Sequence, residues 1–147
     1  MVSGRSVDKG ESMRKLIFLL VMALSTTVYG SRAKEIKYQS SADQSEQPAM
    51  FYVPVSKEPV PLMVALHTWS GNYKQKYHKA IEQWCIKHGW AYIHPDFRGP
   101  NNRPDATGSK LVVADIVSAV EYAKKSTQID HSAIYLVGTS GGGYTAL

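Results

Sequence analysis

Cysteine is nearly absent from the sequence, and long apolar runs are absent altogether. Cys85 is the single cysteine in 147 residues, so no internal disulfide can form, and no spacing of Cys and His matches a zinc site. The longest unbroken apolar run has nine residues, about half of the length that a membrane-spanning helix needs. These shortages exclude a disulfide-stapled domain and a zinc module, and they predict no bound metal and no stable membrane anchor.

The sequence also lacks a large excess of charge of one sign. The formal net charge is +5 at pH 7, and the 17 basic residues are scattered among 12 acidic ones with no stripe or nucleic-acid motif. Such a balance favours solubility over a polyanionic partner, so no nucleic acid is expected. The rest of the composition, with 44% apolar residues and nine Tyr, is typical of a globular chain of about one domain.

The nine-residue apolar run belongs to an N-terminal leader. Arg14 and Lys15 precede Leu16–Leu24, and a polar stretch that ends at Gly30 follows. This order of basic, apolar and polar segments is typical of a secretory signal peptide rather than of an anchor. We therefore expect residues 1–30 to be a signal peptide with Met13 as the true initiator, and the mature protein to be secreted or periplasmic.

Beyond the leader, apolar strands alternate with amphipathic helices. Strands are predicted at residues 36–38, 50–55, 61–67, 90–95 and 133–137, and helices at 77–88 and 109–125. From residue 61 onward the alternation predicts a doubly wound α/β sheet. The apolar faces of the two helices consist of Tyr77, Ile81, Trp84, Cys85 and His88 in the first, and Val112, Val113, Ile116, Val120 and Ala123 in the second. Cys85 is therefore expected to be buried and unreactive.

The last predicted strand, 133–137, is apolar throughout and is expected to be buried. It leads into Gly138-Thr139-Ser140-Gly141-Gly142-Gly143, and residues 144–147 can open a helix. A Gly-x-Ser-x-Gly turn between a strand and a helix is the pattern of a nucleophile elbow, a strained turn that raises a serine hydroxyl above the sheet. The pattern makes Ser140 a candidate nucleophile, with the Gly141 N–H directed at a substrate oxygen that becomes negative.

A glycine-rich turn of this kind has a second interpretation. Gly141, Gly143 and Ala146 also match the spacing of a dinucleotide-binding turn, although no lysine follows the glycines, which excludes a Walker A loop. The acidic residue that would support a dinucleotide site, about 20 positions further on, does not occur within the sequence. The elbow is therefore the favoured interpretation, and no cofactor is expected.

Four segments together resemble the α/β-hydrolase fold. They are the strand Leu62–His67, the loop Asp96-Phe97-Arg98-Gly99, the helix Asp115-Ile116-x-x-Ala119-Val120-x-Tyr122, and the turn Gly138–Tyr144. Over about residues 50–147 the chain is most similar to the catalytic domain of the prolyl oligopeptidase family of serine peptidases and to related esterases. The resemblance implies a Ser nucleophile followed along the chain by an Asp and then a His.

The resemblance also implies a second oxyanion donor in the loop after the strand that ends at His67. Our candidate is the backbone N–H of Trp69, although Thr68 stands where the family usually has the first Gly of His-Gly-Gly. His67 itself is expected to be structural, and so are His94 and His131. Asp115 is expected to cap or pair locally on its helix, whereas Asp96, Arg98 and Asn101 are candidates for contact with substrate at the carboxyl end of a strand.

These observations lead to one main function and two alternatives. The main hypothesis is a secreted serine hydrolase of the prolyl oligopeptidase type that transfers the acyl group of a peptide substrate through Ser140. A carboxylesterase of the same fold and a non-catalytic binding protein are the alternatives. All five histidines precede Ser140, so we expect residues 31–147 to be the N-terminal part of a hydrolase domain, a fragment that ends just after the elbow and has little activity.

Overall fold

A computed structural model describes residues 32–147, so the expected signal peptide lies outside the described residues. The elements are β1 (Lys34–Gln39), β2 (Glu46–Tyr52), β3 (Val60–Leu66), η1 (Lys76–His78), α2 (Lys79–His88), β4 (Ala91–Pro95), η2 (Pro104–Ala106), α3 (Lys110–Ser126), β5 (Ile129–Gly138) and α4 (Gly141–Thr145). None of the helices in this part of the chain has the length and apolar character needed to cross a membrane.

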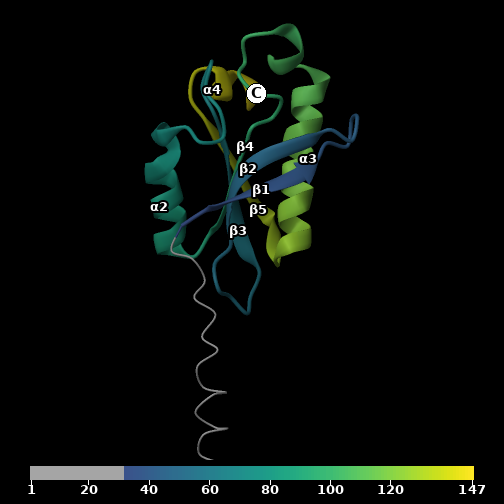
Figure 1. Cartoon of the computed structure of the whole chain (residues 1–147). Helices are drawn as coiled ribbons and strands as arrows, with labels where there is room; N and C mark the ends of the chain where they lie inside the picture. The colour runs from purple at the N-terminus through teal and green to yellow at the C-terminus, as the bar shows by residue number, and fades with distance from the viewer. Residues whose placement is uncertain (1–31) are drawn as a thin grey trace, which may run out of the picture.

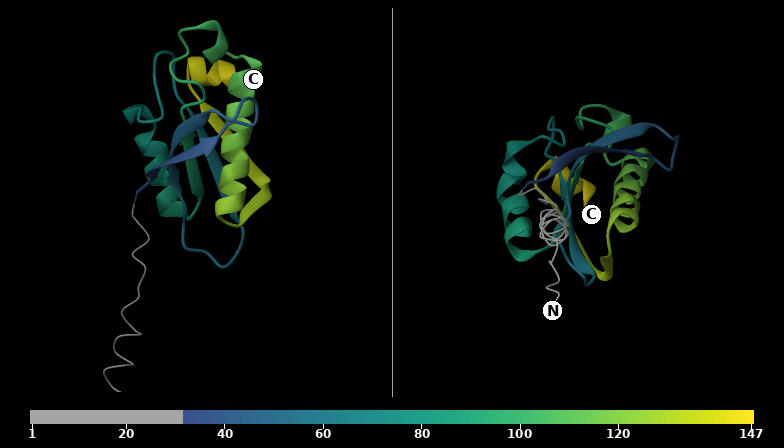
Figure 2. Two further views of the ribbon diagram at one scale, coloured as in Figure 1. Left: turned by 45° about the vertical axis from the view of Figure 1, so that its right-hand side comes forward. Right: turned by 60° about the horizontal axis from the view of Figure 1, so that its bottom comes forward.

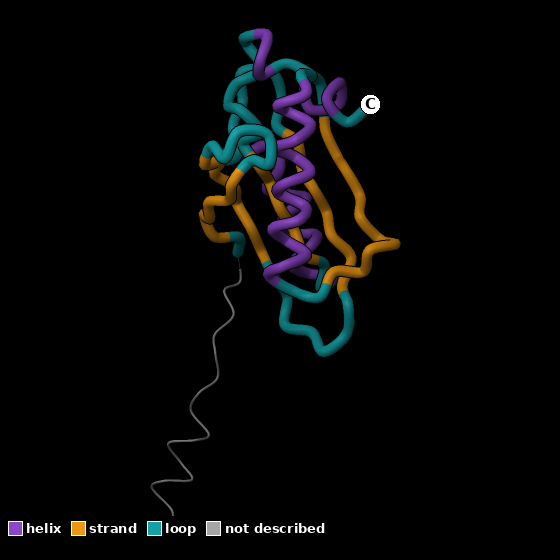
Figure 3. The backbone as a smooth tube through the Cα atoms, turned by 90° about the vertical axis from the view of Figure 1, so that its right-hand side faces the viewer, coloured by secondary structure: helices purple, strands orange, loops and turns teal. Residues whose placement is uncertain are grey.

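The five strands form one mixed sheet with helices on both faces. Its order is β1-β2-β4-β3-β5, in which β1, β2 and β4 pair antiparallel while β3 pairs parallel with β4 and β5. Figures 1 and 2 show α2 on one side of the sheet and α3 on the other, and Figure 3 shows a helix in front of the strands, running roughly along them. The doubly wound sheet predicted from the sequence is therefore present.

Alternation along the central strands builds two apolar cores. On β3, Leu62 and Val64 join the cluster that includes the apolar residues of α3, whereas Ala65 joins the cluster around Cys85 of α2. On β4, Ile93 belongs to the first cluster and Tyr92 to the second. Successive side chains of a strand point to opposite faces of its sheet, so strands covered on both faces are apolar along their whole length. Cys85 is fully buried, as predicted.

The second strand differs from its prediction. It was expected at residues 50–55, but β2 runs from Glu46 to Tyr52 and includes polar residues that the apolar pattern misses. The reason is that β1 and β2 form an antiparallel hairpin whose turn is closed by the Ser40 N–H bonded to the Ser45 carbonyl, 2.9 Å. One face of such a hairpin can meet solvent, and β2 alternates between buried and more exposed residues.

The last strand is longer and less buried than predicted. β5 begins at Ile129, and two of the apolar side chains expected to be covered are exposed, Tyr135 at 49% and Leu136 at 46%. The physical reason is that β5 pairs only with β3 and forms an edge of the sheet made by the described residues. An edge strand has no neighbour to cover one of its sides, so apolarity alone did not predict burial here.

Some residues on the predicted apolar faces of both helices are exposed. Tyr77 lies in η1 rather than in the helix, and its side chain is 59% exposed. Trp84 and Val113 are likewise exposed, although each was assigned to an apolar face. The helix ends follow expectation: Gly89 adopts the left-handed conformation that ends α2, and the Ser109 side chain caps α3 by accepting from the Val112 N–H.

Candidate active site

Ser140 lies at the turn between β5 and α4 and has a strained backbone. Its φ is 56° and its ψ is −119°, which is outside the left-handed well that non-glycine residues occasionally occupy. A residue held in a sparsely populated region of this kind costs about 1–3 kcal/mol and persists only where the surrounding structure imposes it. The side chain is exposed. The strained, solvent-facing serine is the geometry predicted for the elbow.

The strain is imposed by close packing of three backbone segments. A Cβ atom on Gly138 would overlap the backbone of Gly142, and a Cβ on Gly142 would overlap the carbonyl oxygen of Leu66 and come within 2.7 Å of that of His67. Neither position leaves room for any side chain. The glycines predicted from the elbow pattern are therefore required because β5, α4 and the end of β3 come into backbone contact.

The end of β3 brings Trp69 to the elbow. A Cβ on Gly141 would lie 2.8 Å from the backbone nitrogen of Trp69 and 3.1 Å from its Cα. Among the turn and loop hydrogen bonds of residues 32–147, neither the Trp69 N–H nor the Gly141 N–H donates. The backbone of Trp69 thus lies against Gly141, the residue after Ser140, and neither of the two N–H groups predicted as oxyanion donors is engaged in a loop or turn bond.

Exposed aromatic side chains surround the elbow, and the sequence did not predict this. The Tyr77 hydroxyl accepts a 3.4 Å hydrogen bond from the Thr139 hydroxyl, next to Ser140. Tyr144 is 64% exposed and packs where a Cβ on Gly108 would meet its ring. With Trp69, which is 53% exposed, these rings offer apolar surface beside the candidate nucleophile. Tyr77 was overlooked because its spacing matched the apolar face of a helix.

No histidine of the described residues makes a hydrogen bond with the Ser140 hydroxyl. His67, which lies at the end of β3, is fully buried, stacks on Phe97 with ring centroids 3.9 Å apart, and has both ring nitrogens beside backbone carbonyls. Those carbonyls belong to Thr68 at 3.1 Å and Asp96 at 2.9 Å. The structural role expected for His67 agrees with these contacts, which join the β3 and β4 loops.

His78 and His94 form a second buried pair. Their ring centroids are 4.8 Å apart, and His78 Nε2 lies 2.9 Å from the Leu66 carbonyl oxygen. His78 Nδ1 and His94 Nε2 have no hydrogen-bond partner among the described residues. Burial lowers the pKa of both rings, that of His94 to about 3. Both rings are therefore neutral near pH 7. His131 is exposed.

Arg98, a candidate for contact with substrate, is occupied by structural partners. Its guanidinium binds both carboxylate oxygens of Asp115 at 2.8 and 2.9 Å, and it also binds Asp43 at 2.7 Å. Asp115 is fully buried, so the pairing expected on its own helix is instead a link from α3 to the loop after β4. The bonds to Arg98 hold the pKa of Asp43 well below its usual range.

The other two loop candidates are also turned inward. The carboxylate of Asp96 accepts a 3.2 Å hydrogen bond from the Tyr73 N–H, and burial raises the pKa of this carboxyl. Asn101 is 1% exposed. Asp96 therefore supports the loop that carries Trp69, and Asn101 is buried away from solvent.

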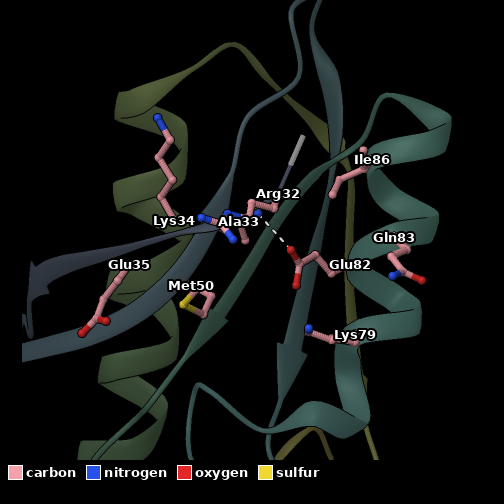
Figure 4. A pocket seen from close by; sticks show the side chains of 9 residues that line it. All are labelled: Arg32, Ala33, Lys34, Glu35, Met50, Lys79, Glu82, Gln83 and Ile86. Atoms are coloured by element: carbon pink, nitrogen blue, oxygen red, sulfur yellow. Dashed lines mark hydrogen bonds between the residues drawn. The ribbon is translucent and has the colours of Figure 1, made fainter. Parts of the chain in front are cut away.

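A cavity of about 560 Å³ lies away from the elbow. Figure 4 shows it between α2 and the first two strands, with Glu82 accepting a 2.9 Å hydrogen bond from the Ala33 N–H. None of its nine lining residues belongs to the elbow or to the Trp69 loop. Within residues 32–147, no group of three or more His, Cys, Asp or Glu side chains is arranged to hold a metal ion.

Solved structures of hydrolases share the fold of this chain. An acylaminoacyl peptidase from Pyrococcus horikoshii superposes with a TM-score of 0.63 at 20% identity, over 89% of this chain and 21% of its own. Esterase Est22 gives 0.60 at 19% identity, over 94% and 44%. S-formylglutathione hydrolase FrmB from Staphylococcus aureus gives 0.59 at 19% identity, over 76% and 48%. The chain has an α/β-hydrolase fold.

The chain spans between about a fifth and a half of the length of these hydrolase-fold structures. No protein-family model matches it, and no curated protein matches it in sequence. The fold and the conformation of Ser140 favour the elbow over the dinucleotide turn as the interpretation of the glycine-rich segment. At this level of identity the likeness establishes the fold alone.

Proposed function

We propose that this chain carries the nucleophile and the oxyanion donors of a serine hydrolase that acts on acyl substrates. The observation that carries the proposal is the backbone of Ser140, at φ 56° and ψ −119°, held between glycines that admit no side chain. Backbone strain at an exposed serine is unexplained by folding alone, because a glycine would occupy the same turn without strain. A requirement for the hydroxyl explains it.

In the proposed reaction the Ser140 Oγ attacks the carbonyl carbon of the substrate. The carbonyl oxygen gains negative charge as the tetrahedral intermediate forms, and the N–H groups of Gly141 and Trp69 stabilise that charge. A serine hydroxyl needs a base to remove its proton. Since no described histidine reaches Ser140, we propose that the base and the acid that orients it lie outside residues 32–147 and follow the Ser-Asp-His order of the fold.

The proposal extends to the class of substrate. A peptide, cleaved as in the prolyl oligopeptidase type, is our first candidate, and an ester cleaved by a carboxylesterase is the second. Neighbouring structures include both an acylaminoacyl peptidase and esterases, and the exposed rings of Trp69 and Tyr77 offer apolar contact to either acyl group. A non-catalytic binding protein with the same fold is the remaining alternative.

A covalent probe tests the nucleophile directly. A fluorophosphonate should label Ser140 by forming an O–P bond and releasing fluoride, and added imidazole should accelerate labelling by serving as the base that takes the proton. General-base assistance is worth roughly 10²–10⁴-fold in enzymes, so even a small part of it is measurable. The control is Ser140→Ala. Equal labelling of the two proteins, with and without imidazole, would exclude the nucleophile and favour the binding protein.

We further propose that the protein is exported. The basic pair Arg14-Lys15 before the apolar run Leu16–Leu24 supports a cleaved signal peptide and a secreted or periplasmic mature form. The lone Cys85 is compatible with an oxidising compartment, because one buried thiol has no internal partner with which to form a disulfide.

A further inference from the structure

The loop that carries Trp69 is a tight turn with one free donor. The Gly71 N–H donates to the Thr68 carbonyl at 2.9 Å, and Ser70 has a φ of 58°, which is left-handed. A positive φ at the third residue of a four-residue turn is the mark of a type II turn. The second residue of such a turn, here Trp69, keeps its N–H out of the turn's own hydrogen bond. That N–H shares a peptide plane with the Thr68 carbonyl, which accepts from the Gly71 N–H and lies 3.1 Å from His67 Nδ1, so its orientation depends on how Thr68 is held.

Thr68 is fixed by the carboxamide of Gln75. The Gln75 Oε1 accepts a hydrogen bond from the Thr68 N–H at 2.9 Å, and the Gln75 Nε2 donates to the Thr68 Oγ1. Gly71 allows this approach, because a Cβ there would lie 3.0 Å from the Gln75 Oε1 and 2.9 Å from the Thr68 carbonyl oxygen. Two bonds from one planar carboxamide fix both the position and the rotation of the residue that they hold.

Gln75 is itself held at the far end of the loop. Its backbone N–H donates to the Asn72 carbonyl at 3.0 Å, and the neighbouring Tyr73 N–H donates to the Asp96 carboxylate. Directly after Gln75 comes η1, whose His78 Nε2 bonds the Leu66 carbonyl. The side chain of Gln75 therefore connects a segment anchored on the sheet to the residue that precedes Trp69.

We propose that Gln75 is a positioning residue for the oxyanion site: its bonds to Thr68 hold the Trp69 N–H beside that of Gly141. The proposal rests on the function proposed for Ser140 and adds to it. It also gives Thr68 a purpose. A glycine at this position would lack the hydroxyl, and the carboxamide would lose its second bond. Thr68 and Gln75 form a matched pair that replaces the flexibility of glycine with a fixed geometry.

The first test observes the loop without any chemistry. In the full chain, Gln75→Met keeps the length of the side chain and removes both hydrogen bonds. We expect it to accelerate hydrogen exchange of the Thr68 amide, which loses its acceptor, and to shift the Trp69 amide resonance. Gln83→Met is the matched control, since Gln83 is an exposed glutamine on α2. Unchanged Thr68 and Trp69 amides in Gln75→Met would overturn the proposal.

The second test measures the rate of Ser140 phosphonylation at a fixed imidazole concentration. Loss of one oxyanion donor costs about 10²–10³-fold in enzymes, so misplacing the Trp69 donor in Gln75→Met should slow labelling by about 10-fold or more. Gln83→Met should react like the parent chain. Thr68→Ser, which keeps the hydroxyl, should react faster than Thr68→Val, which lacks it. Labelling of Gln75→Met at the parental rate would overturn the proposed role.

A double variant separates cooperation from general damage. If Gln75 and Thr68 act as a unit, the combination of Gln75→Met and Thr68→Val should slow labelling little more than Gln75→Met alone. Multiplicative effects would mean that the two side chains act independently and would contradict the proposal that Gln75 and Thr68 hold Trp69 as one unit. Failure of the parent chain to label above Ser140→Ala would reject the proposed function instead, and the amide measurements would still decide whether Gln75 fixes the Trp69 turn.

Discussion

The backbone nitrogen of Trp69 lies 2.8 Å from the point that a Cβ atom on Gly141 would occupy. Two residues that are far apart in the sequence thus come close together, and each brings a backbone N–H that no loop or turn bond uses. The contact depends on glycine at position 141, because backbone atoms cannot move aside as a flexible side chain would. The elbow and the Trp69 loop are therefore one structure in terms of packing.

This contact predicts that Gly141→Ala separates the two donors. The added methyl group should push the Trp69 backbone away, lower the free energy of unfolding by about 1–3 kcal/mol, and slow phosphonylation of Ser140. Gly143→Ala is the milder comparison, because its Cβ would make a tight 3.3 Å contact with the Gly138 carbonyl oxygen, longer than the 2.8 Å approach at Gly141, and alanine is about 1 kcal/mol better than glycine inside a helix. Similar unfolding curves and labelling rates for the two variants would contradict the packing argument.

A second prediction concerns the pair formed by Arg98 and Asp115. Asp115 is fully buried and the Arg98 side chain is 10% exposed, so removing Arg98 leaves a buried carboxylate without compensation, whereas removing the Asp115 charge leaves Arg98 its bond to Asp43. Arg98→Met should therefore destabilise the fold by about 3–5 kcal/mol in urea unfolding, and Asp115→Asn should cost less. The double variant Arg98→Met with Asp115→Asn should lose less than the sum of the two single variants. Strict additivity would show that the pair is not coupled.

The same pair illustrates what sequence can and cannot predict. Apolar alternation predicted β3 and β4 within one residue at either end, because strands covered on both faces must be apolar. The glycine pattern likewise predicted the elbow, since Gly138 and Gly142 lie where neighbouring backbone atoms leave no room for a Cβ. The partners of Arg98 were not predictable, because nothing local in the sequence relates the loop after β4 to Asp115 or to the β1–β2 hairpin. The bonds between Gln75 and Thr68 are similar: the spacing has no regular period, and only the turn brings the two side chains together.

Cys85 supplies a third prediction. The thiol is fully buried on α2, and burial raises its pKa to about 12, so almost no thiolate exists near pH 8. A thiol reagent such as DTNB should therefore leave the native chain unmodified over minutes and modify it at once in guanidinium chloride. Rapid reaction of the native chain would mean that α2 opens readily from the sheet or that the thiol is accessible.

A fourth prediction tests export. Expression of the chain with its leader should yield a mature protein that begins at Ser31, as determined by N-terminal sequencing. Replacement of Leu19 and Leu20 by Glu should interrupt the apolar run and block processing, because the signal requires an unbroken apolar segment of about 7–15 residues. Recovery of intact Met1 or Met13 from the unmodified leader in the cytoplasm would reject a cleaved signal.

The buried histidine pair makes the last prediction, a loss of stability in mild acid. Burial lowers the pKa of His94 to about 3 and also lowers that of His78, whereas an unfolded histidine titrates near 6.5. Below about pH 6.5 the unfolded state therefore binds protons that the folded state does not. The stabilising contribution is complete above that pH and is lost as the pH falls, at up to about 1.4 kcal/mol per pH unit for each histidine.

The measurement is the free energy of urea unfolding at several pH values between 7 and 5. Asp96 titrates with the opposite sign, because burial raises its pKa, so its titration opposes the slope that the histidines impose. His94→Gln should reduce the slope, since it removes the buried ring whose pKa falls to about 3. His131→Gln, which changes an exposed ring, should leave the slope unchanged. A slope in His94→Gln equal to that of the parent chain would show that the buried pair does not control acid sensitivity.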